Sequence, residues 1–375
     1  FLPHLERNVE LKRRYGECFD DAEHPYDPLL DDFEPGATTS EVRAVLAELR
    51  EGLRPLVAAV AGNADAVDAS CLHGSFPVDA QRRLVRELVA DMPLEEGSWR
   101  LDTTVHPFAT AIAATDLRLT TRYDPAYVGA ALWSALHEAG HGIYENGIEA
   151  GLHRTLLSRP VSLGFHESQS RMWENWVGRG RAYLSWIAPR VREAFPEQFD
   201  GVDAEGLYRA ANRVRPSLIR MEADELTYNL HIALRFELEL EIFEERLRLA
   251  ELPEAWNARM EEYLGVEVPD DAHGVLQDVH WAAGSFGYFP TYSLGNLIAG
   301  QIWALAIESL PDLEGDLGRG EMEPLRDWLR ERIYRHGAKF TPAEAIERLC
   351  GGPLSVGPFL GQMERKIGEI YRLAD

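Results

Sequence analysis

The sequence predicts a mainly helical protein folded as one large domain. Helical periodicity dominates from Asp124 to the C-terminus, and the one strand-like stretch, residues 99–123, is short. No Gly/Ser linker, repeat or low-complexity tract divides the 375 residues, and 45% of them are hydrophobic, which is enough for a large buried core. We therefore expect residues 1–375 to form a single domain.

The composition excludes several kinds of partner. A formal net charge of −24 at pH 7 repels the phosphate backbone and excludes nucleic acid. No apolar run approaches the about 20 residues of a membrane span, and no signal peptide is visible at the start. Cys18, Cys71 and Cys350 are odd in number, far apart and not in metal-binding spacing, which fits a reduced, cytoplasmic protein.

The first well-defined element is a β-hairpin. Leu101–Val105 and Leu117–Tyr123 are rich in Thr and alternate as half-buried strands do. Small residues around Ala113–Asp116 supply a turn between them. We expect an antiparallel pair that leads directly into the next helix.

A helix follows the hairpin. Asp124 is a good N-cap, Pro125 a good first-turn residue, and Asn146-Gly147 a good C-terminal stop. Apolar residues recur between them at helical spacing: Val128, Ala131, Leu132, Ala135, Leu136, Ala139 and Ile143. One side of this helix is therefore predicted to face the core.

This helix carries the HExxH pattern as His137-Glu138-Ala139-Gly140-His141. Residues four apart lie on one helix face, so both imidazoles can reach one metal ion, and Glu138 can face a water on that metal. This is the ligand pair and general base of a zinc hydrolase. The structural alternative is two histidines on a polar helix face, bonded to nearby carboxylates.

A catalytic zinc needs a third protein ligand. The strongest candidate is Glu167, 26 residues after His141, a gap that suits a loop and a second helix packed against the first. Alternatively, Glu167 is a surface carboxylate paired with Arg171 at i+4. Four other residues have suitable ligand chemistry: Glu145, His153, His166 and Glu174.

Six segments together resemble one family. They are His106-Pro107-Phe108, Asp116–Thr120, His137–His141, His166–Gln169, Ile219–Asp224 and Gly274–Trp281. In this order they match the HPF, DxRxT, HExxH, HES/GQ, IRxxAD and GxxQDxHW signatures of carboxypeptidase Taq-type metallocarboxypeptidases. The resemblance extends over essentially the whole chain.

The resemblance implies a fold and an activity. The fold is a large, mainly α, zincin-like domain similar to neurolysin and angiotensin-converting enzyme, with a small antiparallel β-sheet beside a deep active-site groove. The activity is metal-dependent release of single C-terminal residues from peptides, with broad specificity. Members are cytoplasmic homodimers that hold Zn²⁺ or Co²⁺. They usually carry a further N-terminal helical region, which we expect this chain to lack.

The same resemblance assigns the metal ligands to His137, His141 and Glu167 and the catalytic carboxylate to Glu138, in agreement with the choice made from the residues. The oxyanion formed during amide hydrolysis needs further donors. We rank His280 first, followed by Tyr288 and Tyr292. The two tyrosines have an alternative role in aromatic packing.

A carboxypeptidase must also bind a free carboxylate, which arginine does best. The family-matched candidates are Arg118 and Arg220. Arg118 has an alternative partner in Asp116 within the hairpin, and Arg220 has one in Asp224 at i+4 of an expected helix.

Three further residues complete the predicted site. His106 either orients substrate or caps a strand, and Gln277 and Asp278 are expected to support the orientation of histidines at the site. Three other readings of the chain stay open: an oligopeptidase or dipeptidase on the same scaffold, a non-catalytic binding protein and an inactive fragment. The intact Glu138 argues against the non-catalytic reading.

Overall fold

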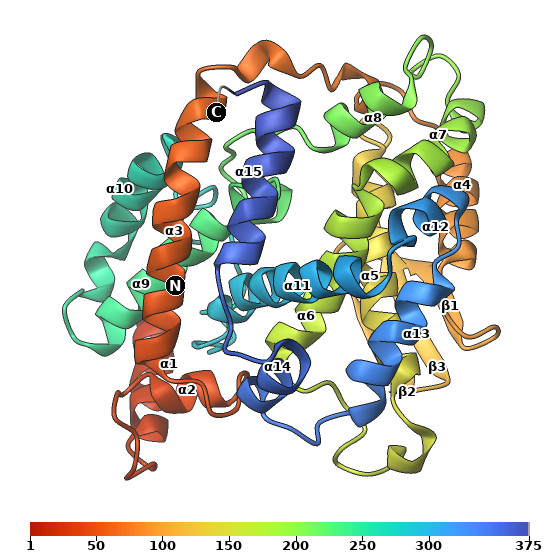
Figure 1. Ribbon diagram of the computed structural model, residues 1–375. Coiled ribbons are helices and arrows are strands. Elements are labelled where there is room, and N and C mark those ends of the chain that lie inside the picture. The colour runs from red at the N-terminus through yellow and green to blue at the C-terminus, as the bar shows by residue number, and fades with distance from the viewer. Residues whose placement is uncertain (374–375) are drawn as a thin grey trace.

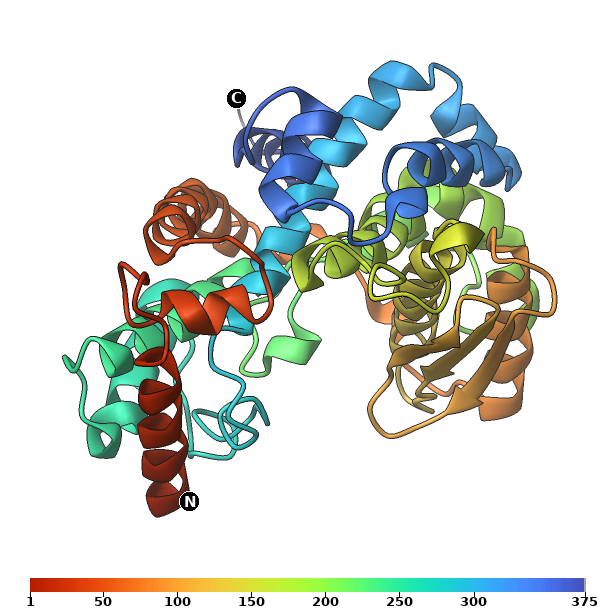
Figure 2. The same cartoon turned by 90° about the horizontal axis from the view of Figure 1, so that it is seen from below.

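The computed structural model describes residues 1–373 and shows two groups of helices joined by central helices (Figures 1 and 2). The first group comprises α1 (Leu2–Gly16), α2 (Asp27–Asp31), α3 (Thr39–Ala61), α9 (Tyr228–Phe243) and α10 (Leu252–Leu264). The second comprises the sheet with α4 (Val78–Asp91), α5 (Gly129–Gly147), α7 (Arg181–Ala194), α8 (Ala204–Ala211), α12 (Leu313–Arg319) and α13 (Glu323–Arg332). The central elements are α6 (Leu163–Arg171), a π-helix η4 (Met172–Gly178), α11 (Phe289–Ser309), α14 (Pro342–Cys350) and α15 (Gly357–Tyr371).

The first group combines segments that are distant in the sequence, because α3 packs against α9 (Figure 1). Helix α3 begins with a capping box in which Thr38 accepts from the backbone N–H of Glu41. Its buried residues recur at helical spacing, as in Val42, Leu46, Leu49 and Leu53. Helix α9 is buried on nearly all sides because it lies among α3, α10 and α11.

The sheet is mixed, which corrects the expected antiparallel sheet. Its order is β1 (Trp99–Thr103), β3 (Asp116–Thr121), β2 (Ala109–Ala113), with β1 parallel and β2 antiparallel to β3. The two Thr-rich stretches are thus parallel neighbours, and the hairpin partner of β3 is the alanine-rich β2. Alanine has low strand propensity, so composition gave no signal for β2.

Helix α5 ends at Gly147, as predicted, but begins at Gly129 instead of just after Asp124. Asp124 Oδ1 accepts from the backbone N–H of Ala126 at 2.8 Å, which makes a local turn that delays the helix. The sheet covers α5 through Leu117 and Leu119, whose side chains are fully buried.

The expected helix around residues 219–231 is interrupted. A short 3-10 turn, η5 (Arg220–Glu222), precedes α9, and the carboxylate of Asp224 accepts from the backbone N–H groups of Leu226 and Thr227, both at 3.0 Å. Asp224 therefore stabilises the turn that leads into α9 instead of pairing with Arg220 along a helix. Within residues 1–373, no helix has the length and apolar character needed to cross a membrane.

Candidate metal centre and active site

A cavity of about 1240 Å³ opens between the two groups of helices. Helices α5 and α6 contribute the HExxH residues and Glu167 to its wall. The opposite wall contains Arg220 and Tyr228, from η5 and the start of α9. Residues of the predicted site from both groups therefore face one space, as expected for a deep active-site groove.

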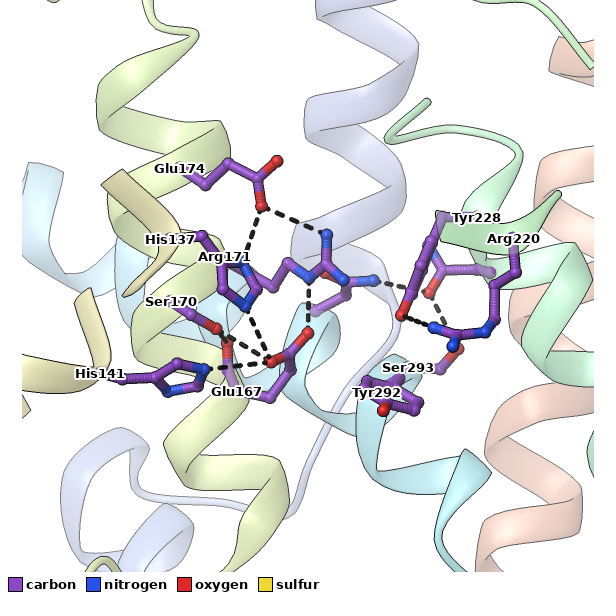
Figure 3. A network of polar contacts seen from close by, with 12 residues as sticks. His137, His141, Glu167, Ser170, Arg171, Glu174, Arg220, Tyr228, Tyr292 and Ser293 are labelled. Atoms are coloured by element: carbon purple, nitrogen blue, oxygen red, sulfur yellow. Dashed lines mark hydrogen bonds and ion pairs between the residues drawn. The ribbon is translucent and has the colours of Figure 1, made fainter. Parts of the chain in front are cut away.

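The three predicted metal ligands converge in this cavity (Figure 3). One ligand atom from each of His137, His141 and Glu167 lies within 4.8 Å of the other two. Oε2 of Glu167 is 3.6 Å from Nε2 of His137 and 3.7 Å from Nε2 of His141. The spacing of the histidines on α5 and the packing of α6 against α5 together produce this arrangement.

Close backbone approach places Glu167 beside the histidines. A Cβ atom on Gly140 would lie 2.6 Å from the carbonyl oxygen of Gln169, so only glycine lets α5 approach α6 this closely. On the other side, a Cβ atom on Gly295 of α11 would lie 2.8 Å from the Cβ of Glu167. Helix α6 is thus held between α5 and α11, and Glu167 has little room to move.

The other candidate ligands have different partners. Oε1 of Glu145 lies 3.4 Å from Nε2 of His166, and the ring of His166 lies 4.1 Å from that of His141. Nε2 of His153 lies 3.2 Å from the carbonyl oxygen of Ile148. Glu174 lies behind the histidines, where its Oε2 is 2.9 Å from Nδ1 of His137.

The sequence suggested Glu174 only as an alternative metal ligand and Arg171 only as an ion-pair partner of Glu167. The Nδ1–Glu174 hydrogen bond turns Nε2 of His137 toward the site. Arg171 donates from Nε to Oε1 of Glu167 at 2.7 Å, so the ion pair considered as an alternative to metal binding is also present. It leaves Oε2 of Glu167 facing the two histidines, so ion pairing and metal binding are compatible.

Glu138 is buried and lines the cavity. Burial raises the pKa of this carboxyl to about 7, with His137 opposing the shift and Glu167 and Glu174 adding to it. Burial also holds the pKa of His141 well below its usual value, helped by His166. A neutral imidazole is the form that binds a metal.

On the far wall, Arg220 belongs to a cluster of two arginines around Asp278, and the sequence did not predict these pairings. Arg220 donates from Nε and Nη2 to Oδ1 of Asp278 at 3.0 and 2.7 Å. Arg235 donates to the other oxygen of Asp278 at 2.7 Å and to Gln277 at 2.8 Å. Gln277 and Asp278 therefore hold two arginines instead of supporting the metal-site histidines, because their loop packs on α9, across the cavity from α5.

The two arginine candidates for carboxylate binding differ in position. Arg220 is buried and lines the cavity. Arg118 forms an ion pair with Asp116, in which Nη2 donates a hydrogen bond to Oδ2 at 3.0 Å and Nε lies 2.8 Å from Oδ1, and it is not among the residues that line the cavity. Strand alternation explains this, because Leu117 and Leu119 face α5 and Arg118 faces away from it. This placement argues against a substrate contact by Arg118.

The predicted oxyanion donors also differ in whether they line the cavity. Tyr288 and Tyr292, at the start of α11, line the cavity, as does the exposed His106 of the β1–β2 connection. His280 does not line it: its ring packs 4.3 Å from that of Phe289, and its Nε2 lies 3.1 Å from the hydroxyl of Tyr292. His280 thus lies behind Tyr288 and Tyr292, which separate it from the cavity.

Residues 1–367 match the sequence model of the carboxypeptidase Taq (M32) metallopeptidase family. The chain belongs to this family. It is 44% identical to thermostable carboxypeptidase 1 of Thermus thermophilus, over 99% of this chain and 74% of that protein, and 40% identical to carboxypeptidase 1 of Bacillus subtilis, over 100% and 74%. The M32 carboxypeptidase of Deinococcus radiodurans R1 superposes with a TM-score of 0.96 at 42% identity, covering 99% of this chain and 75% of that one.

As an M32 metallocarboxypeptidase, the chain requires a divalent metal, and its residues fit one. Two imidazole nitrogens and one carboxylate oxygen form the donor set of a catalytic metal site with an open fourth position. Nδ1 of His137 is already occupied by Glu174, which leaves Nε2 to the metal. The predicted fold and enzyme class are confirmed by these comparisons and by the helical architecture.

Proposed function

We propose that the protein releases single C-terminal residues from peptides with broad side-chain tolerance, and that Glu138 is the general base. The observation that carries this proposal is that the His137–His141–Glu167 group and a buried arginine, Arg220, face one cavity. A metal group alone serves any metallopeptidase. A carboxylate-binding group opposite it restricts cleavage to the end of a chain.

The guanidinium of Arg220 retains N–H donors that can bind a carboxylate. It has five N–H groups, of which Nε and Nη2 donate to Asp278 and Nη1 donates to the hydroxyl of Tyr228 at 3.0 Å. These bonds leave one N–H on Nη1 and one on Nη2. That pair matches the two oxygens of a C-terminal carboxylate.

The chemistry is metal-assisted amide hydrolysis. Bound at His137, His141 and Glu167, a divalent metal supplies an activated water and polarises the scissile carbonyl. Glu138 takes the proton from the attacking water and gives it to the leaving amine.

The two tyrosines at the start of α11 donate to the developing oxyanion. The 3.1 Å contact between His280 and Tyr292 fixes the orientation of one of them.

Several finer assignments complete the proposal. We propose Zn²⁺ as the metal, with Co²⁺ able to replace it, since the donor set is of the type that binds either. His106, on the cavity wall, is a substrate contact. Membership of the family also suggests a homodimer, which light scattering can test. It further suggests a cytoplasmic location, which is consistent with the free thiols of Cys18, Cys71 and Cys350.

The test compares a peptide with a free C-terminus, its C-terminal amide and an N-acetylated version. We expect stepwise loss of single residues from the free and acetylated peptides, and little cleavage of the amide. Cleavage of the amide at the same rate would contradict the exopeptidase assignment. Glu138→Gln should lower kcat by about 10²–10⁴-fold while zinc binding is retained, and an active variant would remove Glu138 from its role.

A further inference from the structure

Tyr228 lies between two guanidinium groups that belong to opposite walls of the cavity (Figure 3). The carbon at the centre of the Arg171 guanidinium is 4.3 Å from the centre of the Tyr228 ring. Nη1 of Arg220 donates to the Tyr228 hydroxyl at 3.0 Å. The side chain is buried, and it is the first residue of α9. One tyrosine thus contacts a cation from each wall.

On the metal side, Arg171 continues the contact to the ligands. Its Nε donates to Glu167 at 2.7 Å and its Nη1 donates to Oε2 of Glu174 at 3.3 Å. The same oxygen of Glu174 is the one bonded to His137. Arg171 is therefore in contact with one metal ligand and with the carboxylate that orients another.

On the substrate side, Asp278 and Tyr228 hold Arg220 from two directions. Asp278 fixes the Nε–Nη2 edge of the guanidinium, and the Tyr228 hydroxyl fixes Nη1. With both contacts made, the plane of the guanidinium is set. With the tyrosine contact removed, it can tilt about its bonds to Asp278.

We propose that Tyr228 is a positioning residue that couples the metal group to Arg220 and thereby fixes the one-residue spacing between the scissile bond and the C-terminal carboxylate. This inference rests on the proposed function, in which Arg220 binds that carboxylate. Glu167, Arg171, Tyr228 and Arg220 form an unbroken series of contacts across the cavity.

The ring and the hydroxyl of Tyr228 have different roles. The ring face attracts the Arg171 cation and holds its guanidinium close to the start of α9. The hydroxyl acts on Arg220 alone. Burial keeps the phenol neutral by raising its pKa, even though both arginines oppose the shift. A neutral hydroxyl accepts one hydrogen bond from Arg220 and keeps its own proton, which it can donate to a group in the cavity.

Two variants separate these roles. Tyr228→Phe removes the hydroxyl and retains the ring, while Tyr228→Leu removes both. Tyr183→Phe is the matched control, because Tyr183 is a buried tyrosine of α7 whose hydroxyl has no hydrogen-bond partner within residues 1–373. Arg220→Gln is made alone and together with Tyr228→Phe. Each is assayed for kcat and KM with the free and amidated peptides, and for Zn²⁺ affinity by competition with a chelator.

For Tyr228→Phe we expect KM for the free peptide to rise about tenfold, equivalent to about 1.4 kcal/mol, with kcat, Zn²⁺ affinity and cleavage of the amide unchanged. Tyr228→Leu should show the same rise and also bind Zn²⁺ about tenfold more weakly. Tyr228→Phe should add nothing in the Arg220→Gln background. Arg171→Lys tests the metal contact should Tyr228→Leu fail to fold.

The outcomes distinguish this inference from the function on which it rests. If Arg220→Gln abolishes the preference for a free C-terminus and Tyr228→Phe matches Tyr183→Phe, the positioning role is wrong and the proposed function stands. If Arg220→Gln retains the preference, both are wrong. Additive effects in the double variant, or unchanged Zn²⁺ affinity in both Tyr228→Leu and Arg171→Lys, also overturn the coupling.

Discussion

Replacing Gly140 with alanine is predicted to damage the metal site from a position that holds no ligand. The added Cβ would lie 2.6 Å from the carbonyl oxygen of Gln169 and 2.8 Å from the Cα of Ser170. Ordinary contact begins at 3.4 Å, so the first distance is short by 0.8 Å. Both atoms belong to the backbone of α6, and neither can rotate away. Helices α5 and α6 must therefore separate.

The size of the effect follows from two opposing terms. Alanine improves helix propensity by about 1 kcal/mol, whereas overpacking of this kind costs about 1–3 kcal/mol. We expect a net loss of about 1 kcal/mol in the free energy of unfolding of the metal-free protein. Because Glu167 is on α6, its Oε2 moves away from both histidines, and Zn²⁺ affinity should fall by about tenfold or more.

The assay is urea unfolding of the metal-free protein together with chelator competition for Zn²⁺. Gly368→Ala in α15 is the matched control, since a Cβ there meets nothing within 4 Å. It should stabilise the protein by about 0.5–1 kcal/mol and leave Zn²⁺ affinity unchanged. If Gly140→Ala behaves like Gly368→Ala in both measurements, close approach of the two helices does not position Glu167.

Three further predictions concern single side chains. Glu174→Gln should weaken Zn²⁺ binding by about 10–100-fold and, because the buried Glu174 also pairs with Arg171 and Arg179, should destabilise the protein toward urea as well; unchanged Zn²⁺ affinity of the folded variant would mean that Glu174 does not orient His137. Arg118→Ala should leave kcat/KM unchanged for free and amidated peptides, because Arg118 pairs with Asp116 away from the cavity; a selective loss on the free peptide would restore it as a substrate contact. Burial raises the pKa of Glu34 to about 7 from 4.5, so its contribution to stability is fully present below pH 4.5 and is lost as the pH rises through 7. Between pH 5 and pH 8, the unfolding free energy of the metal-free protein should therefore fall by on the order of 3 kcal/mol more with Glu34 present than in the Glu34→Gln variant. Parallel pH profiles for the two proteins would contradict this.

The grouping of His137, His141 and Glu167 was predictable from the sequence because its geometry is local. His137 and His141 share a helix face by spacing alone, and Glu167 follows in the next helix. The start of α5 could not be predicted in the same way, because Asp is as suitable for a local turn, which Asp124 forms, as for the N-cap of a helix.

The far wall could not be predicted because its pairs are distant in sequence. Arg220 pairs with Asp278, 58 residues away, whereas spacing suggested Asp224, which instead stabilises the turn before α9. Tyr228 carried no signal at all, as its role depends on two arginines that approach it from opposite walls. Glu174 follows a change from α-helix to π-helix after Arg171, and this change alters which face it occupies.

The most direct test of the central claim is a crystal structure of the Glu138→Gln variant with Zn²⁺ and a peptide that has a free C-terminus. We predict Zn²⁺ at about 2.0–2.2 Å from Nε2 of His137, Nε2 of His141 and Oε2 of Glu167. The peptide carboxylate should accept from Nη1 and Nη2 of Arg220, with the last peptide bond over the metal. A carboxylate bound elsewhere, or Glu167 outside the coordination sphere, would contradict the account.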